Sequence, residues 1–86
     1  MKFTVVWKRS AEAALAEIWL SADDRQAVRD AANSMEALLR STPLQVGESR
    51  ADATRILTVD PLSVYYDVLE NDQLVAVWAV WPIQKT

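Results

Sequence analysis

The stretch RILTVDPLSVYYDVLENDQLVAVWAVW, Arg55 to Trp81, decides the fold of this chain. It holds three short runs of β-branched and aromatic residues, separated by Asp60-Pro61 and by the polar turn Glu70-Asn71-Asp72. Runs bounded by turn residues are typical of consecutive antiparallel strands, and their short connections favour hairpins over crossovers. The segment from Thr54 to Trp81 therefore predicts a three-stranded antiparallel meander.

Alternation along these strands predicts which side chains share a face of the sheet. In the second run, one side carries Leu62, Val64, Tyr66 and Val68. In the last run, Leu74, Ala76, Trp78 and Val80 oppose Val75, Val77, Ala79 and Trp81. Both faces of this strand are apolar, which is typical of a central strand covered on both sides. Helices can cover one face, and we expect a partner protein to cover the other.

The segment upstream of the meander predicts a strand followed by a helix. Phenylalanine, valine and tryptophan favour a strand from Lys2 to Lys8. Ser10 is a suitable N-cap, and Glu12 suits the first turn of a helix that ends near Leu20. Apolar residues follow Ser10 at steps of three and four, as one buried helix face requires.

A second helix and a loop complete the pattern. Ser21 and Asp24 form a Ser-x-x-Asp variant of the capping box, and a long apolar stripe predicts a helix from about Asp23 to Arg40. Leu44 to Ala53 contains the only glycine and predicts an exposed loop. We therefore expect one α+β domain over residues 1–86, with an N-terminal strand, a two-helix hairpin and the meander.

Composition excludes several classes of chemistry. The chain has no cysteine and no histidine, so it has no disulfide framework, no thiolate metal site and no Ser-His-Asp or zinc-histidine centre. Asp23 and Asp24 need no metal ion, because acids at a helix start complement the helix dipole. We expect no metal and no cofactor. No apolar run approaches the roughly 20 residues that span a bilayer, which favours a cytoplasmic protein without a membrane partner.

Charge and hydrophobicity indicate the kind of partner. Nine basic residues against twelve acidic ones leave a formal charge of −3, the opposite of the balance that phosphate binding usually needs. Direct sequence-specific DNA binding is not expected. Apolar residues make up 51% of the chain and include four tryptophans, so we expect part of this surface to meet another protein.

The order of strand, helical hairpin, glycine-containing loop and meander resembles the RelE/ParE superfamily of type II toxin-antitoxin toxins. The segments that carry the resemblance are VVWKRSAEAALAEIW at Val5–Trp19, LLRSTPLQVGESR at Leu38–Arg50 and RILTVDPLSVYYDVLENDQLVAVWAV at Arg55–Val80. They span nearly the whole chain. The match lies in hydrophobic pattern, order and spacing more than in invariant residues.

The resemblance implies a small toxin that a cognate antitoxin neutralises by laying an extended and helical segment over its apolar sheet and helices. RelE-like members cleave mRNA in the ribosomal decoding site, with Lys and Arg on the sheet and an Arg and a Tyr or His near the C-terminus. ParE-like members lack much of that set and inhibit DNA gyrase by protein contact. Either a homodimer or a toxin-antitoxin hetero-oligomer is compatible with the sequence.

The candidate catalytic residues are Arg50, Arg55, Tyr65 and Tyr66. The arginines stand where the resemblance implies cations that stabilise a scissile phosphate, and the tyrosines are the remaining groups for proton transfer. Structural alternatives are ion pairs for the arginines and ordinary sheet packing for the tyrosines. The C-terminus lacks the Arg and the Tyr or His of the nuclease type, and only Lys85 could replace them. RNA cleavage by the known mechanism is therefore poorly supported.

The candidate partner contacts are Trp78, Trp81 and Arg55. Tryptophans often dominate the binding energy of interfaces. Because simple alternation puts Trp78 and Trp81 on opposite faces, we expect one to fill the core and the other to meet a partner. Trp7 and Trp19 are expected to pack within the domain.

These observations predict a toxin component that inhibits growth by binding a macromolecular target of the gyrase type and that a cognate antitoxin neutralises. One alternative is a ribosome-dependent mRNA endoribonuclease that uses the four catalytic candidates. Another is a toxin fold that serves only as a binding or dimerisation module.

Overall fold

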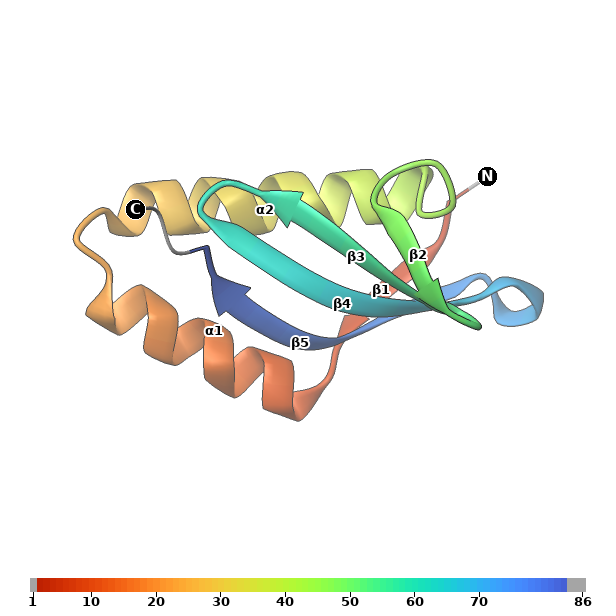
Figure 1. Ribbon diagram of the computed structural model, residues 1–86, viewed down its shortest axis with the longest axis horizontal. Coiled ribbons are helices and arrows are strands. Elements are labelled where there is room, and N and C mark those ends of the chain that lie inside the picture. Colours follow the sequence, from red (N-terminus) through yellow and green to blue (C-terminus); the bar gives the residue numbers. More distant parts are fainter. Residues whose placement is uncertain (1, 84–86) are drawn as a thin grey trace.

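The computed structural model describes residues 2–83 and shows an α+β fold built on one mixed sheet (Figure 1). Its elements are β1 (Thr4–Trp7), α1 (Arg9–Ser21), α2 (Arg25–Ser41), β2 (Glu48–Ala51), β3 (Thr54–Val59), β4 (Leu62–Leu69), the 3-10 turn η1 (Glu70–Asp72) and β5 (Leu74–Pro82). The strand order is β1-β5-β4-β3-β2, with β1 parallel to β5 and the other pairs antiparallel. Within residues 2–83, no helix has the length and apolar character needed to cross a membrane.

The predicted meander is confirmed. Strands β3 and β4 form a hairpin around Asp60-Pro61, with Val59 opposite Leu62. The polar turn η1 then joins β4 to β5. Proline and acidic residues at these two turns stop one strand and allow the chain to reverse, as the sequence pattern predicts.

Strand β2 is absent from the sequence-based prediction, which treated Leu44 to Ala53 as a loop throughout. In the structure Glu48 pairs with Ile56 and Ser49 with Arg55, so β2 forms one edge of the sheet. All four β2 residues are exposed. An edge strand that buries no side chain has no apolar alternation to reveal it, because only its backbone holds it in place.

The starts of both helices differ from the predicted caps. Ser10 lies inside α1, whose N-cap position is Lys8. Asp24 alone caps α2: its Oδ1 accepts a hydrogen bond from the Ala27 amide at 3.0 Å. Ser21 cannot take part in a capping box there, because it forms the last residue of α1. A carboxylate three residues before a free amide satisfies one of the helix's unpaired donors.

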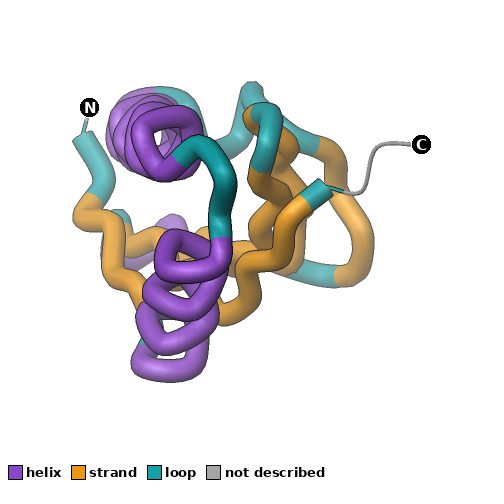
Figure 2. Tube along the Cα trace, turned by 90° about the vertical axis from the view of Figure 1, so that its left-hand side faces the viewer, coloured by secondary structure: helices purple, strands orange, loops and turns teal. Residues whose placement is uncertain are grey.

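The two helices occupy different positions against the sheet. Helix α2 turns its buried residues Val28, Ala31, Met35 and Leu39 toward the strands, and α1 runs beside β5 with Ala11 fully buried (Figures 1 and 2). Their side chains form one core with inward residues of the strands, which are Leu57, Leu62, Val64, Tyr66, Val68, Val75, Val77 and Val80. The helices therefore cover one face of the sheet, and within residues 2–83 no helix covers the other face.

We expect the substitution Asp24→Ala to lower the free energy of unfolding by about 1 kcal/mol, because it removes the N-cap of α2. Urea denaturation of the purified chain measures this loss. Asp23→Ala is the matched control, since Asp23 is exposed and does not occupy the N-cap position. Equal losses in the two variants would contradict a capping role for Asp24.

Candidate functional site

A β-bulge in β5 places both C-terminal tryptophans on the open face of the sheet. Tyr65 pairs with Ala79 and Tyr66 with Val77, so β5 carries one extra residue, Trp78, at this point. A bulge of this kind shifts the phase of alternation along the strand. The expectation that Trp78 and Trp81 lie on opposite faces is therefore wrong: both contact the ring of Tyr65.

Tyr65, Trp78 and Trp81 form an aromatic cluster on this face. The rings of Tyr65 and Trp78 are stacked, with centroids 5.1 Å apart and planes 13° apart. The Trp81 ring lies 4.8 Å from that of Tyr65 and is tilted by 51°. Such pairs hold one another in place, yet Trp78 remains 37% exposed. The cluster thus presents a preformed apolar surface.

Asp67 belongs to the same surface, and the sequence analysis missed it. Its Oδ1 accepts hydrogen bonds from Thr54 Oγ1 at 2.6 Å and from Trp78 Nε1 at 3.2 Å. These two donors fix the carboxylate beside the indole ring. The available signal was alternation, because Asp67 lies two residues after Tyr65 and so shares its face.

Tyr66 lies on the opposite side of β4 and is completely buried. Its hydroxyl oxygen is 2.9 Å from the Pro43 carbonyl oxygen and 3.0 Å from that of Val46, so the hydroxyl donates into the loop after α2. Burial raises the pKa of Tyr66, and the neighbouring Arg55 guanidinium opposes that rise by its hydrogen bond and its charge. The buried phenol therefore stays protonated at neutral pH and anchors the loop.

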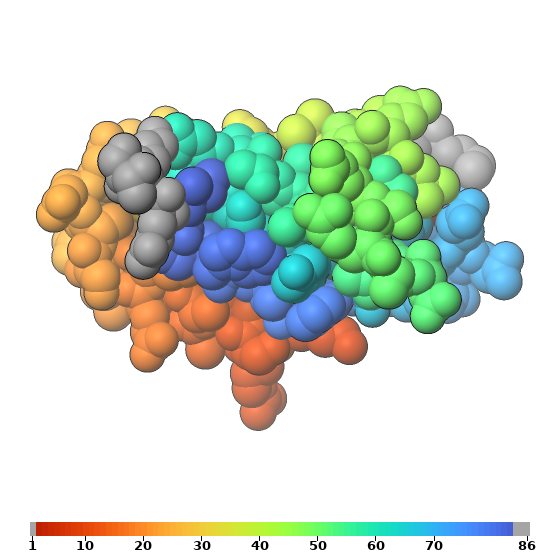
Figure 3. Space-filling view, viewed as in Figure 1, coloured from red at the N-terminus to blue at the C-terminus, as the bar shows by residue number. Residues whose placement is uncertain are grey.

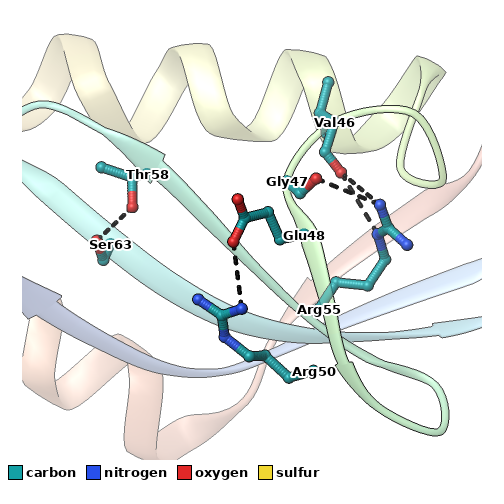
Figure 4. Close-up of polar contacts among 7 residues, drawn as sticks. All are labelled: Val46, Gly47, Glu48, Arg50, Arg55, Thr58 and Ser63. Atoms are coloured by element: carbon teal, nitrogen blue, oxygen red, sulfur yellow. Dashed lines mark hydrogen bonds and ion pairs between the residues drawn. The ribbon is translucent and has the colours of Figure 1, made fainter.

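Arg55 contacts the same loop. Its Nη2 donates to the Val46 carbonyl at 3.1 Å and, more weakly, to that of Gly47 at 3.4 Å, while Nε lies 3.4 Å from the Val46 oxygen (Figure 4). Gly47 has φ of +70°, and a Cβ there would collide with the Ile56 carbonyl oxygen. Only glycine fits this close approach. Arg55, Tyr66 and Gly47 together determine how the chain enters β2.

Arg50 lies on β2 and points away from Arg55 (Figure 4). Its Nη1 is 3.2 Å from Glu48 Oε2, and the Arg50 side chain is 48% exposed. An exposed ion pair of this kind contributes little to stability. The four catalytic candidates are thus separated: Arg55 and Tyr66 face the loop, Tyr65 lies in the aromatic cluster, and Arg50 lies at the sheet edge. Lys85 lies outside the described residues.

A second apolar surface lies between α1 and α2. It is a groove of about 640 Å³ whose apolar lining residues include Trp7, Leu15, Trp19, Leu20, Val28 and Ala32. Leu20 is 62% exposed at its rim. Trp7 Nε1 donates to Glu36 at 3.2 Å, and the Arg25 guanidinium lies 4.7 Å from the Trp19 ring centre. Both tryptophans therefore have contacts within the domain.

Comparison with known proteins identifies the fold as that of RelE/ParE toxins. A chain of the toxin-antitoxin complex RelBE2 from Mycobacterium tuberculosis matches with a TM-score of 0.80 at 15% identity, covering 95% of this chain and 92% of that one. The chromosomal ParDE system from P. aeruginosa gives 0.74 at 19% identity, covering 96% and 98%. The isolated E. coli RelE toxin gives 0.66 at 15% identity, covering 98% and 87%.

No protein-family model matches the sequence, and no curated protein does. The likeness is therefore one of structure, shared with both RelE-type and ParE-type proteins, and the predicted resemblance to this superfamily is confirmed at the level of fold.

We expect Tyr66→Phe to destabilise the chain by about 1–2 kcal/mol, because it removes a buried donor from the Pro43 and Val46 carbonyls. Urea denaturation at pH 7 measures the effect. Tyr65→Phe is the matched control, since the Tyr65 contacts are made by its ring.

The same pair of variants has a predicted pH dependence. The pKa of Tyr66 is raised above the unfolded value of about 10, so its contribution is fully present below that pH and is lost as the pH rises toward the folded pKa. Wild type and Tyr65→Phe should therefore lose stability between pH 10 and 11 more steeply than Tyr66→Phe. Parallel losses in all three proteins would contradict this assignment.

Proposed function

We propose that this chain is the toxin of a type II toxin-antitoxin pair, that it acts in the cytoplasm, and that it inhibits growth by binding a macromolecular target of the gyrase type. A cognate antitoxin neutralises it. The fold supports the toxin role, and the open face of the sheet supports action by protein contact.

The observation that carries this proposal is the chemistry of the open face. Cleavage of RNA requires cations placed to stabilise the charge that develops on a phosphate. Arg55 has its Nε and Nη2 directed to loop carbonyls, and Arg50 is paired with Glu48. Aromatic side chains lie on the open face beside the Glu48–Arg50 ion pair of β2. Apolar, partly exposed tryptophans favour a protein partner over a phosphate backbone.

The proposed partner contacts are Trp78 and Trp81 on the open face, with Arg55 as a separate contact at the loop after α2. Contact with the Tyr65 ring, stacked for Trp78 and tilted for Trp81, holds both indole rings in place before binding, which lowers the entropic cost of association. An antitoxin that covers the aromatic cluster and the groove between α1 and α2 would bury both apolar surfaces. The bound assembly is then a toxin-antitoxin hetero-oligomer.

The alternative is a ribosome-dependent mRNA endoribonuclease, because RelE structures share this fold. Tyr65 is the catalytic candidate best placed for it, since its ring lies on the open face whereas Tyr66 is buried. Such an enzyme would need Arg50 to leave Glu48 and approach the substrate. A third possibility is a binding or dimerisation module without toxicity.

Expression of the chain alone tests the proposed function directly. We expect growth arrest with altered DNA supercoiling and intact mRNA. Ribosome-dependent cuts in mRNA would support the nuclease instead, and normal growth would leave only the binding module. Supercoiling of a reporter plasmid and global mRNA integrity are measured in the same cells.

Variants of the open face show whether arrest depends on the aromatic cluster. Trp78→Ser should abolish arrest without unfolding the chain, because Trp78 is already partly exposed. Leu44→Ser is the matched control, since Leu44 is 45% exposed but lies in the loop after α2. Arrest that survives Trp78→Ser would exclude this face as the target contact.

We also expect the free chain to associate with itself, because its two apolar surfaces are uncovered without the antitoxin. Sedimentation velocity over a concentration series measures the association, and Trp78→Ser should reduce it more than Leu20→Ser if the sheet face forms the homodimer. A monomer at high concentration would count against an exposed binding face.

A further inference from the structure

The aromatic cluster lies beside the Asp67 carboxylate. Trp19, on the helix side, already carries the guanidinium of Arg25 at 4.7 Å from its ring centre. Among residues 2–83, no comparable cation covers Tyr65, Trp78 or Trp81. Aromatic faces attract cations through the ring quadrupole, and the attraction grows when the site loses water. The open face can therefore form a cation–π contact of the kind that Arg25 and Trp19 form on the helix side.

Asp67 adds charge to this surface. Its two hydrogen-bond donors, Thr54 Oγ1 and Trp78 Nε1, both donate to the same oxygen, Oδ1. Within the described chain, Oδ2 has no hydrogen-bond donor, so it can accept one from a partner. Two hydrogen bonds already restrict the Asp67 side chain, so it loses little further conformational entropy when a partner binds. Charge-assisted hydrogen bonds to a carboxylate are strong.

We propose that the open sheet face binds its protein partner through an arginine of that partner, whose guanidinium stacks on Trp78 and pairs with Asp67. The inference rests on the proposed function, because it takes the partner to be a protein that is either the antitoxin or the target. Apolar side chains flank this arginine, because Val6 is 42% exposed and lies opposite Ala76 on the neighbouring strand.

Two features favour arginine over other ligands. A planar guanidinium can stack on a ring and donate to a carboxylate at once, which the compact lysine ammonium does less well. A nucleic acid would also stack its bases on these rings. Its phosphates, however, would meet the Asp67 carboxylate on a chain of net charge −3. A basic protein segment matches both the aromatic and the acidic part of the surface.

Nuclear magnetic resonance of the ¹⁵N-labelled chain tests the inference without knowledge of the natural partner. Each of the four tryptophans contributes one indole N–H signal, which Trp→Phe variants assign. The probes are acetyl-Leu-Arg-Leu-amide and its citrulline counterpart, which keeps the shape of arginine but has no charge, both at constant ionic strength. We expect the arginine peptide alone to shift the Trp78 and Trp81 signals, with Trp7 and Trp19 unmoved.

Two matched variants separate the carboxylate from net charge. Asp67→Asn keeps an acceptor for Thr54 and Trp78, and it should weaken binding about three- to tenfold. Asp72→Asn removes the same charge from the exposed turn η1 and should leave binding unchanged. Equal binding of the citrulline peptide, or equal loss in the two variants, would overturn the inference. So would larger shifts of the same signals with hexauridylate RNA.

The peptide-binding experiment and the growth experiment can fail independently of each other. A chain that arrests growth but does not discriminate arginine from citrulline would retain the toxin proposal and reject this contact. A chain that discriminates between the peptides but does not arrest growth would retain the contact and reject toxicity.

Discussion

The pairing of β4 with β5 is the constraint on which both the core and the open face depend. Its register shift at Tyr65 and Tyr66 lets β5 keep Val75, Val77 and Val80 in the core on either side of the bulge. The extra residue is accommodated by turning Trp78 outward. One irregularity in the ladder thus preserves the burial of three valines and collects the aromatic side chains on the other face.

Helix α1 supports this region from the side. Strand β1 pairs with β5 only from Leu74 to Val77, and α1 continues along β5 beyond that point. Ser10 Oγ donates to the Trp78 carbonyl at 3.1 Å, which satisfies a backbone acceptor at the bulge. The space-filling view shows this open face, with the β5 residues in blue between α1 and the β2–β3 hairpin (Figure 3). The fold therefore links the helix start to the candidate site.

The fold shared with RelE-type and ParE-type structures does not by itself define a function, because function depends on the side chains that the fold presents. Here the open face carries the aromatic cluster, the Asp67 carboxylate and, at its β2 edge, the Glu48–Arg50 ion pair. The two arginines predicted as catalytic cations both have contacts within the domain. Arg55 donates to the Val46 carbonyl, and Arg50 pairs with Glu48. Under the proposed function, this face contacts a protein partner.

The sequence by itself determined the α+β class, the meander, the two helices and the inward face of β4, because turn residues and apolar periodicity are local signals. It did not show β2, whose exposed residues carry no pattern, nor the cap of α2, which depends on which acid reaches the Ala27 amide. Only the tertiary structure decided that Trp78 and Trp81 share a face with Tyr65 and Asp67. A β-bulge arises from pairing between strands, and no feature of a single strand specifies where the extra residue falls.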